Sequence, residues 1–105
     1  MAKDIFLITQ KFPLEEKFSL TDQIRRSSRS VCVNLAEAYR KRRYKAHFVS
    51  KLSDAETENT ETGVWLDFSL DFNYITKVEF EDLTARNTEV GKLLYFMINN
   101  PDKFL

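Results

Sequence analysis

The residues best suited to chemistry are basic side chains grouped in the first half of the chain. From residue 25 to residue 45 there are eight lysines and arginines but only one acid, Glu37. The basic residues are Arg25, Arg26, Arg29, Arg40, Lys41, Arg42, Arg43 and Lys45. Guanidinium groups form paired hydrogen bonds with phosphate oxygens, and Tyr39 and Tyr44, which lie among them, could stack on bases. The cluster indicates a surface that binds the backbone of RNA or DNA without reading its sequence.

The distribution of charge supports a second interpretation of the same residues. The chain has no net charge, yet residues 1–47 have eleven basic and five acidic side chains, whereas residues 48–105 have five basic and eleven acidic ones. The basic cluster could therefore be a solvated surface that pairs with the acidic second half of the same chain or of a neighbouring subunit. Two functions stay open at this point: nucleic-acid binding, and a structural role as an oligomeric adaptor.

Two polar residues stand in the most apolar part of the sequence. The segment Val31–Ala38 is apolar on nearly all sides of a helix except at Asn34 and Glu37. We expect this segment to pack on more than one side, as the central helix or in an oligomer interface. We expect Asn34 and Glu37 to form a buried, structural hydrogen-bond network that fixes the register of the helices. A ligand-binding or catalytic role for this pair is the alternative.

The sequence carries no recognisable catalytic or metal-binding motif. His47 is the only histidine and Cys32 the only cysteine, so no pair of strong metal ligands is present. The carboxylates at positions 54, 56, 58 and 61 lack the Glu-x-x-His motifs of di-metal bundles. No nucleophile elbow occurs, and the two isolated glycines cannot form a phosphate-binding loop. We therefore expect no enzymatic activity, no catalytic residue, no metal and no cofactor.

Helical periodicity runs through the rest of the sequence and predicts an all-α protein. Four segments show it: about residues 2–12, from residue 19 into the basic run 40–45, residues 44–72 and residues 76–99. Pro13 should end the first segment, Ser19 is a candidate N-cap of the second, and Thr76 with Glu79 matches a capping box. Short connections between amphipathic helices indicate an antiparallel up-down four-helix bundle with a short first helix, residues 1–105 forming a single domain.

Polar residues interrupt the apolar seam of the third segment. The seam has 4-3 spacing and consists of Phe48, Leu52, Ala55, Asn59, Thr62, Leu66 and Ser69. Because a buried polar group without a partner is costly, Asn59 and Thr62 predict close helix approach or hydrogen bonds between helices. The short first helix should leave part of the core uncovered, where a partner subunit could cover it.

The chain has the composition of a soluble protein of the cytoplasm. No stretch approaches the roughly 20 apolar residues of a membrane span, and the apolar run at residues 5–8 is too short for a signal peptide. A lone cysteine favours a reducing compartment. We expect a cytoplasmic location and no membrane partner.

The motifs assembled above resemble a known family. Residues 12–31, FPLEEKFSLTDQIRRSSRSV, resemble the family signature FP-x-x-E-x-x-x-L-x-x-Q-I-R-R-a-x-x-S-v, and residues 34–38, NLAEA, resemble its N-I-A-E-G motif. Glu61-Thr62 falls where the family carries E-T in its third helix. The family is that of the four-helix-bundle proteins encoded by intervening sequences in 23S rRNA genes. Its relatives include the accessory variability determinant of diversity-generating retroelements.

The resemblance implies an assembly and a set of partners. Members of the family are implied to form homopentameric rings, and the retroelement relatives to bind nucleic acid and a reverse transcriptase, a nucleic-acid-handling protein, through a basic surface. This chain departs from the pattern in three ways: its first helix is shorter, Ala38 replaces the usual glycine, and its net charge is zero where the nucleic-acid-binding relatives are strongly basic.

Overall fold

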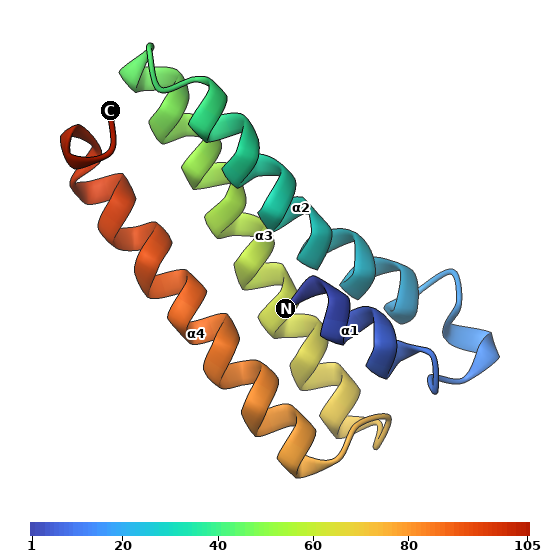
Figure 1. Cartoon of the computed structure of the whole chain (residues 1–105). Coiled ribbons are helices and arrows are strands. Elements are labelled where there is room, and N and C mark those ends of the chain that lie inside the picture. Colours follow the sequence, from blue (N-terminus) through green and yellow to red (C-terminus); the bar gives the residue numbers. More distant parts are fainter.

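The protein is a bundle of four α-helices without strands, as expected. The computed structural model describes all residues from 1 to 105. The helices are α1 (Ala2–Thr9), α2 (Leu20–Arg40), α3 (Lys45–Asp71) and α4 (Lys77–Asn99), with short 3-10 turns at Leu14–Glu16 (η1) and Pro101–Lys103 (η2). The three long helices run antiparallel along a molecule of 44 × 24 × 17 Å, and α1 lies beside the first half of α2 (Figure 1). No helix has a stretch long and apolar enough to cross a membrane.

The first helix ends three residues earlier than the expected boundary at Phe12. After Thr9 the backbone tightens, because the amides of Lys11 and Phe12 bond to the carbonyls of Ile8 and Thr9, three residues back. Such 3-10 bonding is the usual way in which a helix end satisfies its last carbonyls. The side chain of Phe12 then turns into the core, where it is 8% exposed.

The second helix begins and ends where expected, although its cap differs. Ser19 occupies the N-cap position, but its hydroxyl donates to Glu16 and makes no bond to the amides of α2. The helix ends at Arg40, and α3 begins at Lys45 after a short turn. The basic run thus forms the end of α2 and the α2–α3 turn, as its sequence indicated.

The third and fourth helices also match the sequence-based boundaries. All seven seam residues of α3 are buried. Thr76 and Glu79 form the predicted capping box, in which the Glu79 amide donates to Thr76 Oγ1 at 3.1 Å and the Thr76 amide donates to Glu79 Oε1 at 2.9 Å. Asn73, in the turn between the helices, has a φ of 60°, a left-handed conformation that asparagine tolerates well.

A polar layer separates two apolar clusters of the core. One cluster, around Ile5, Ile24 and Leu66, lies at the end that α1 covers, and the other, around Phe48, Leu52 and Leu94, lies at the opposite end. Between them, Ser27 Oγ and Thr62 Oγ1 share a hydrogen bond of 2.8 Å, and the side chains of Asn59 and Asn87 bond α3 to α4. The hydrogen bonds between helices that the interrupted seam predicted are therefore confirmed.

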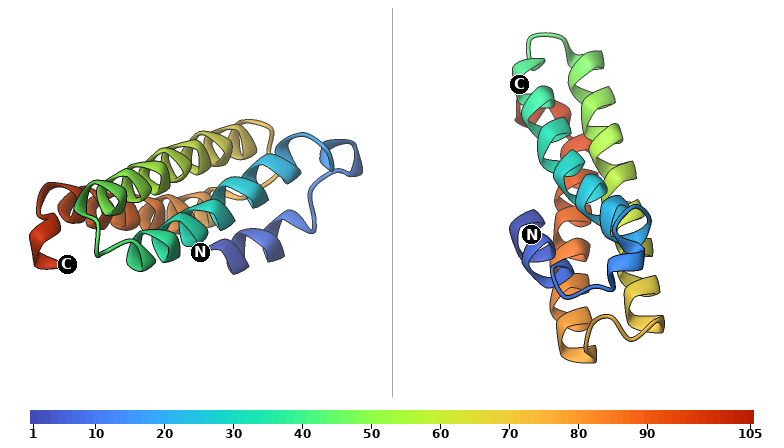
Figure 2. Two further views of the ribbon diagram at one scale, coloured as in Figure 1. Left: turned by 90° about the horizontal axis from the view of Figure 1, so that it is seen from above. Right: turned by 90° about the vertical axis from the view of Figure 1, so that its right-hand side faces the viewer.

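The short α1 leaves the second half of α2 without a neighbour on one side. Figure 2 shows α1 beside only one end of the bundle. Beyond it, Val33 is 54% exposed and Cys32 and Ala36 are also exposed. Within one chain, the expectation that the segment Val31–Ala38 packs on more than one side is therefore wrong. Whether a second subunit covers this surface stays a prediction.

Candidate nucleic-acid interface and an apolar groove

The first part of the basic surface is held in place by α1. The guanidinium of Arg25 lies 4.5 Å from the centre of the Phe6 ring, and that of Arg29 lies 5.5 Å from it. Arg25 Nε also donates to Thr9 Oγ1 at 2.7 Å. No carboxylate of the chain pairs with either arginine. Stacking and a neutral hydrogen bond orient Arg25 without neutralising it, which leaves its charge available to an anion.

Two of the eight predicted residues are neutralised within the chain. Arg26 lies 3.3 Å from a carboxylate oxygen of Glu58 and 3.3 Å from one of Glu61 on α3. Lys45 lies 3.1 Å from Asp102 in η2. These pairs are of the kind that the second interpretation of the sequence proposed, basic side chains of the first half with acids of the second half.

The remaining cations lie at the α2–α3 turn with exposed aromatic rings. Arg40, Lys41, Arg42 and Arg43 form no ion pair in the chain. The Arg42 guanidinium stacks 3.5 Å from the centre of the Tyr39 ring, and its Nε donates to the Tyr39 carbonyl. Tyr39 is 61% exposed and Tyr44 57%. This end of the bundle therefore offers positive charge and aromatic faces together.

The predicted surface is two clusters and not one continuous stripe. Arg25 and Arg40 are fifteen residues apart on one helix, which corresponds to roughly 22 Å along its axis. Val33 and Ala36 lie between them, exposed and uncharged. We call the cluster of Arg25 and Arg29 on Phe6 the α1 cluster, and the group Arg40–Arg43 the turn cluster.

The predicted buried network of Asn34 and Glu37 is not present. Glu37 is exposed and forms an ion pair with Lys51 at 2.7 Å, which raises the pKa of Lys51. Asn34 is half-buried and donates to the Ser30 carbonyl of its own helix at 3.0 Å. The two residues do not bond to each other. The second helix is more exposed around these two residues than its composition suggested, because α1 does not extend to this level. The buried polar network lies instead at Asn59 and Asn87.

The residues considered for catalysis lie apart from one another. His47 is exposed and contacts the Tyr44 ring, with 5.7 Å between ring centres. Glu58 and Glu61, from the acidic segment of α3, are engaged by Arg26. No group of three or more His, Cys, Asp or Glu side chains is close enough together to hold a metal ion.

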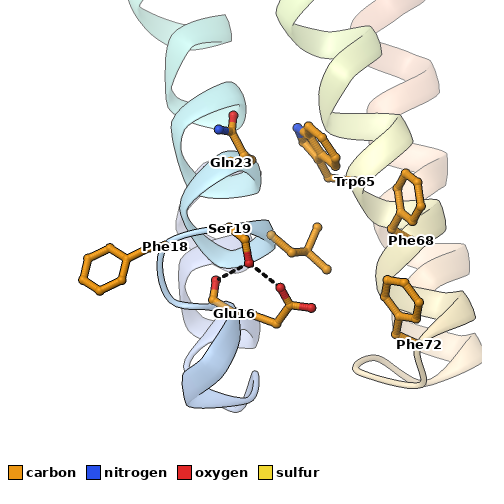
Figure 3. Close-up of a pocket in the computed structure, with 8 residues that line it drawn as sticks. Glu16, Phe18, Ser19, Gln23, Trp65, Phe68 and Phe72 are labelled. Carbon is orange, nitrogen blue, oxygen red and sulfur yellow. Dashed lines mark hydrogen bonds between the residues drawn. The ribbon is translucent and has the colours of Figure 1, made fainter.

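A second site, which the sequence analysis missed, is an apolar groove between the start of α2 and the end of α3 (Figure 3). Its volume is about 460 Å³, and its lining residues are Glu16, Phe18, Ser19, Leu20, Gln23, Trp65, Phe68 and Phe72. Trp65, Phe68 and Phe72 have i, i+3, i+7 spacing on a face of α3 other than the seam. This spacing of three aromatic residues is the sequence feature that could have indicated the groove.

The fold and these surfaces define a small four-helix-bundle protein with a basic second helix and a polar layer in its core. The chain belongs to the 23S rRNA-intervening sequence protein family, whose sequence pattern matches residues 1–96. This confirms the family resemblance read from residues 12–38.

A solved structure supports the same assignment. The chain is similar to a protein of unknown function from the S23 ribosomal protein family of Bacteroides thetaiotaomicron, whose crystal structure has been determined at 1.70 Å. The two are 30% identical, the match covers 92% of this chain and 87% of that one, and the TM-score is 0.81. Among curated proteins, none matches the sequence significantly.

Proposed function

We propose that this protein is a non-enzymatic, self-assembling helical bundle that binds the phosphate backbone of nucleic acid through the α1 cluster and the turn cluster. The observation that carries the proposal is that six of the eight predicted basic residues have no carboxylate partner in a chain with as many acids as bases. In a chain with no net charge, cations left unpaired on one helix and its following turn form a local positive field that attracts an anionic polymer.

The geometry of the α1 cluster supports phosphate as the ligand. Phe6 and Thr9 restrict the rotation of Arg25, so less conformational freedom is lost when its guanidinium binds a phosphate. The turn cluster adds Tyr39 and Tyr44, whose exposed rings suit unpaired bases. The names of the family and of the similar solved protein refer to 23S rRNA and to a ribosomal protein family, which makes RNA the first nucleic acid to test.

Assembly and partners complete the proposal. Exposed apolar side chains on α2 and α4, such as Val33 and Leu93 at 54% and 52%, suit contacts between subunits. The family resemblance implies a homopentamer, and the retroelement relatives that the resemblance brings in are the reason to propose docking of a nucleic-acid-handling protein on the same basic surface. We place this activity in the cytoplasm, in line with the reducing compartment that a lone cysteine favours.

The test is binding of a labelled RNA stem-loop and a DNA duplex, measured by anisotropy at low and at physiological salt. We expect log affinity for the duplex to fall with log salt with a slope of about −0.9 per phosphate contact. The triple variant Arg25→Glu, Arg29→Glu and Arg40→Glu should abolish binding. The matched control reverses three exposed lysines without ion pairs: Lys3, Lys77 and Lys92. If both triple variants bind equally, or if wild type fails to bind at low salt, the proposal is wrong.

The adaptor function remains the second candidate, and the ion pairs of Arg26 and Lys45 favour it. If neighbouring subunits neutralise the turn cluster in the same way, Arg40→Glu with Arg43→Glu should dissociate the assembly. Sedimentation velocity measures this. Dissociation without any nucleic-acid binding by wild type supports the adaptor, and an intact assembly with lost nucleic-acid binding supports the interface.

A further inference from the structure

The groove at Trp65 contains one charged group, and that group has no counter-ion. Glu16 accepts hydrogen bonds from the Ser19 hydroxyl and from Tyr74 Oη, the latter at 2.8 Å. These donors hold the pKa of Glu16 below its ordinary value of 4.5, the bond from Ser19 contributing most. No lysine or arginine pairs with it. In Figure 3 its carboxylate extends into the space between α2 and α3. A fixed, unpaired anion favours a cationic partner.

The walls of the groove are aromatic and continue into a wider apolar rim. Phe68 is 43% exposed and Phe72 is 53% exposed, while Leu20, between the two helices, is buried. Phe18, at the edge of the groove, is 85% exposed, and its ring points away from the groove into solvent (Figure 3). Exposed apolar surface that extends beyond a pocket marks a contact with a macromolecule more than with a small ligand.

The groove also contains an indole N–H without an acceptor. Trp65 Nε1 is covered and has no hydrogen-bond partner in the chain. It points toward Gln23 in Figure 3, but the Gln23 side-chain oxygen accepts from Arg26 Nε at 3.3 Å. A carbonyl reaches this covered N–H only when a neighbouring side chain moves aside. Because an unsatisfied buried donor is costly, that contact gains more than a hydrogen bond at the open surface.

We propose that this groove docks a segment of a partner protein that presents an apolar side chain beside a lysine or arginine. The apolar side chain lies between Leu20 and the rings of Phe68 and Phe72, the cation pairs with Glu16, and a carbonyl of the segment accepts from Trp65. Because its single charge is negative, the groove repels phosphate. The proposal is therefore independent of nucleic-acid binding at the basic clusters and can succeed or fail without it.

Trp65 is the only tryptophan, so its indole N–H gives one isolated cross peak in a ¹⁵N–¹H spectrum. The probe is the peptide acetyl-Arg-Leu-Phe-Arg-amide, added to the full chain. We expect the indole proton to move downfield and to saturate. The peptides acetyl-Glu-Leu-Phe-Glu-amide and acetyl-Arg-Ser-Ser-Arg-amide should leave the peak in place at the same concentrations, because the first lacks the cation and the second lacks the apolar side chains.

Variants distinguish docking in the groove from nonspecific binding of the peptide elsewhere on the surface. Glu16→Gln should lower the affinity for the cationic peptide by about threefold, as expected for the loss of an exposed ion pair. Glu15→Gln, at an exposed residue that does not line the groove, should leave the affinity unchanged. Phe68→Ser should remove binding, and Phe96→Ser, a ring on α4 with the same 43% exposure, should not. Peptide-binding equal to wild type in Glu16→Gln and Phe68→Ser overturns the proposal. An indole peak that moves with protein concentration alone also overturns it, because a second copy of the chain then fills the groove.

Discussion

Asn59 of α3 and Asn87 of α4 bond reciprocally across the middle of the bundle. Asn59 Nδ2 donates to the Asn87 carbonyl at 2.9 Å, and Asn87 Nδ2 donates to the Asn59 carbonyl at 2.8 Å and to its Oδ1 at 3.0 Å. Each side chain thus bonds to the backbone of the facing helix. These bonds form only when Asn59 and Asn87 lie at the same level of the bundle. The pair therefore fixes the axial position of α3 relative to α4.

Replacement of Asn87 by alanine should destabilise the fold. The change removes the two hydrogen bonds that Asn87 Nδ2 donates and leaves Oδ1 of Asn59, a residue that is 4% exposed, without its partner. A loss of about 2–3 kcal/mol in the free energy of unfolding follows from the cost of a buried group without a partner. Urea unfolding measures it. The control, Asn99→Ala, removes one exposed bond to Tyr95 within α4 and should change stability by less than about 0.5 kcal/mol.

The two glycines beside this pair should respond differently to alanine. A Cβ at Gly63 would lie 2.9 Å from Asn87 Oδ1, whereas one at Gly91 would lie 3.3 Å from Asn59 Nδ2. Crowding of this kind costs about 1–3 kcal/mol and competes with a helix-propensity gain of about 1 kcal/mol. The melting temperature of Gly63→Ala should therefore be lower than that of Gly91→Ala. In the background of Asn87→Ala the cost at Gly63 should vanish, and a cost that persists there would show that another contact is responsible.

Acid should weaken the attachment of η1 through Glu16. Its pKa is lowered in the folded chain, chiefly by the Ser19 hydroxyl and then by Tyr74, so its contribution to stability is present above pH 4.5 and is lost as the pH falls through the folded pKa. Between about pH 5 and pH 3, a range that spans this titration, the midpoint of denaturant unfolding should therefore change less for Glu16→Gln than for wild type. Identical acid profiles for wild type and Glu16→Gln would contradict the assignment.

Alkaline pH should act on the other partner of the same hydrogen bond. The bond to Glu16 raises the pKa of Tyr74 above its ordinary value of 10.0. The stabilisation is therefore complete below pH 10.0 and is lost as the pH rises through the folded pKa. Tyr74→Phe should lack this loss and should already be less stable at neutral pH. Ultraviolet titration of tyrosinate in wild type and in the variant measures the shift, and a Tyr74 that ionises with the other tyrosines would contradict it.

Two neighbouring arginines of α2 should contribute differently to nucleic-acid binding. Arg29 has no carboxylate partner, whereas Arg26 is paired with Glu58 and Glu61. Under the proposed function, Arg29→Gln should reduce the salt-dependence slope by about one phosphate contact, and Arg26→Gln should leave the slope unchanged. Anisotropy titrations over a range of salt concentrations distinguish the two. Equal losses in both variants would mean that the pairs of Arg26 open when nucleic acid binds.

Local patterns determined a large part of this fold. The seven seam residues of α3 and the capping box of Thr76 with Glu79 were readable in advance, because both depend on spacings within one helix. The turn at the basic run and the family likeness of residues 12–38 were readable for the same reason. The position of the N-terminal helix was predicted correctly, but its predicted end at Phe12 lies beyond the observed end at Thr9. The 3-10 bonding after Thr9 depends on how Phe12 enters the core.

Tertiary structure alone decided which polar groups meet. The pairing of Arg26 with Glu58 and Glu61, the stacking of Arg25 on Phe6 and the exposure of Glu37 depend on the rotation and axial register of neighbouring helices. The groove at Trp65 arises in the same way, from η1 and α3 segments about fifty residues apart in sequence. Helical periodicity tells which residues share a face, but which face meets which partner is set by packing of the whole bundle.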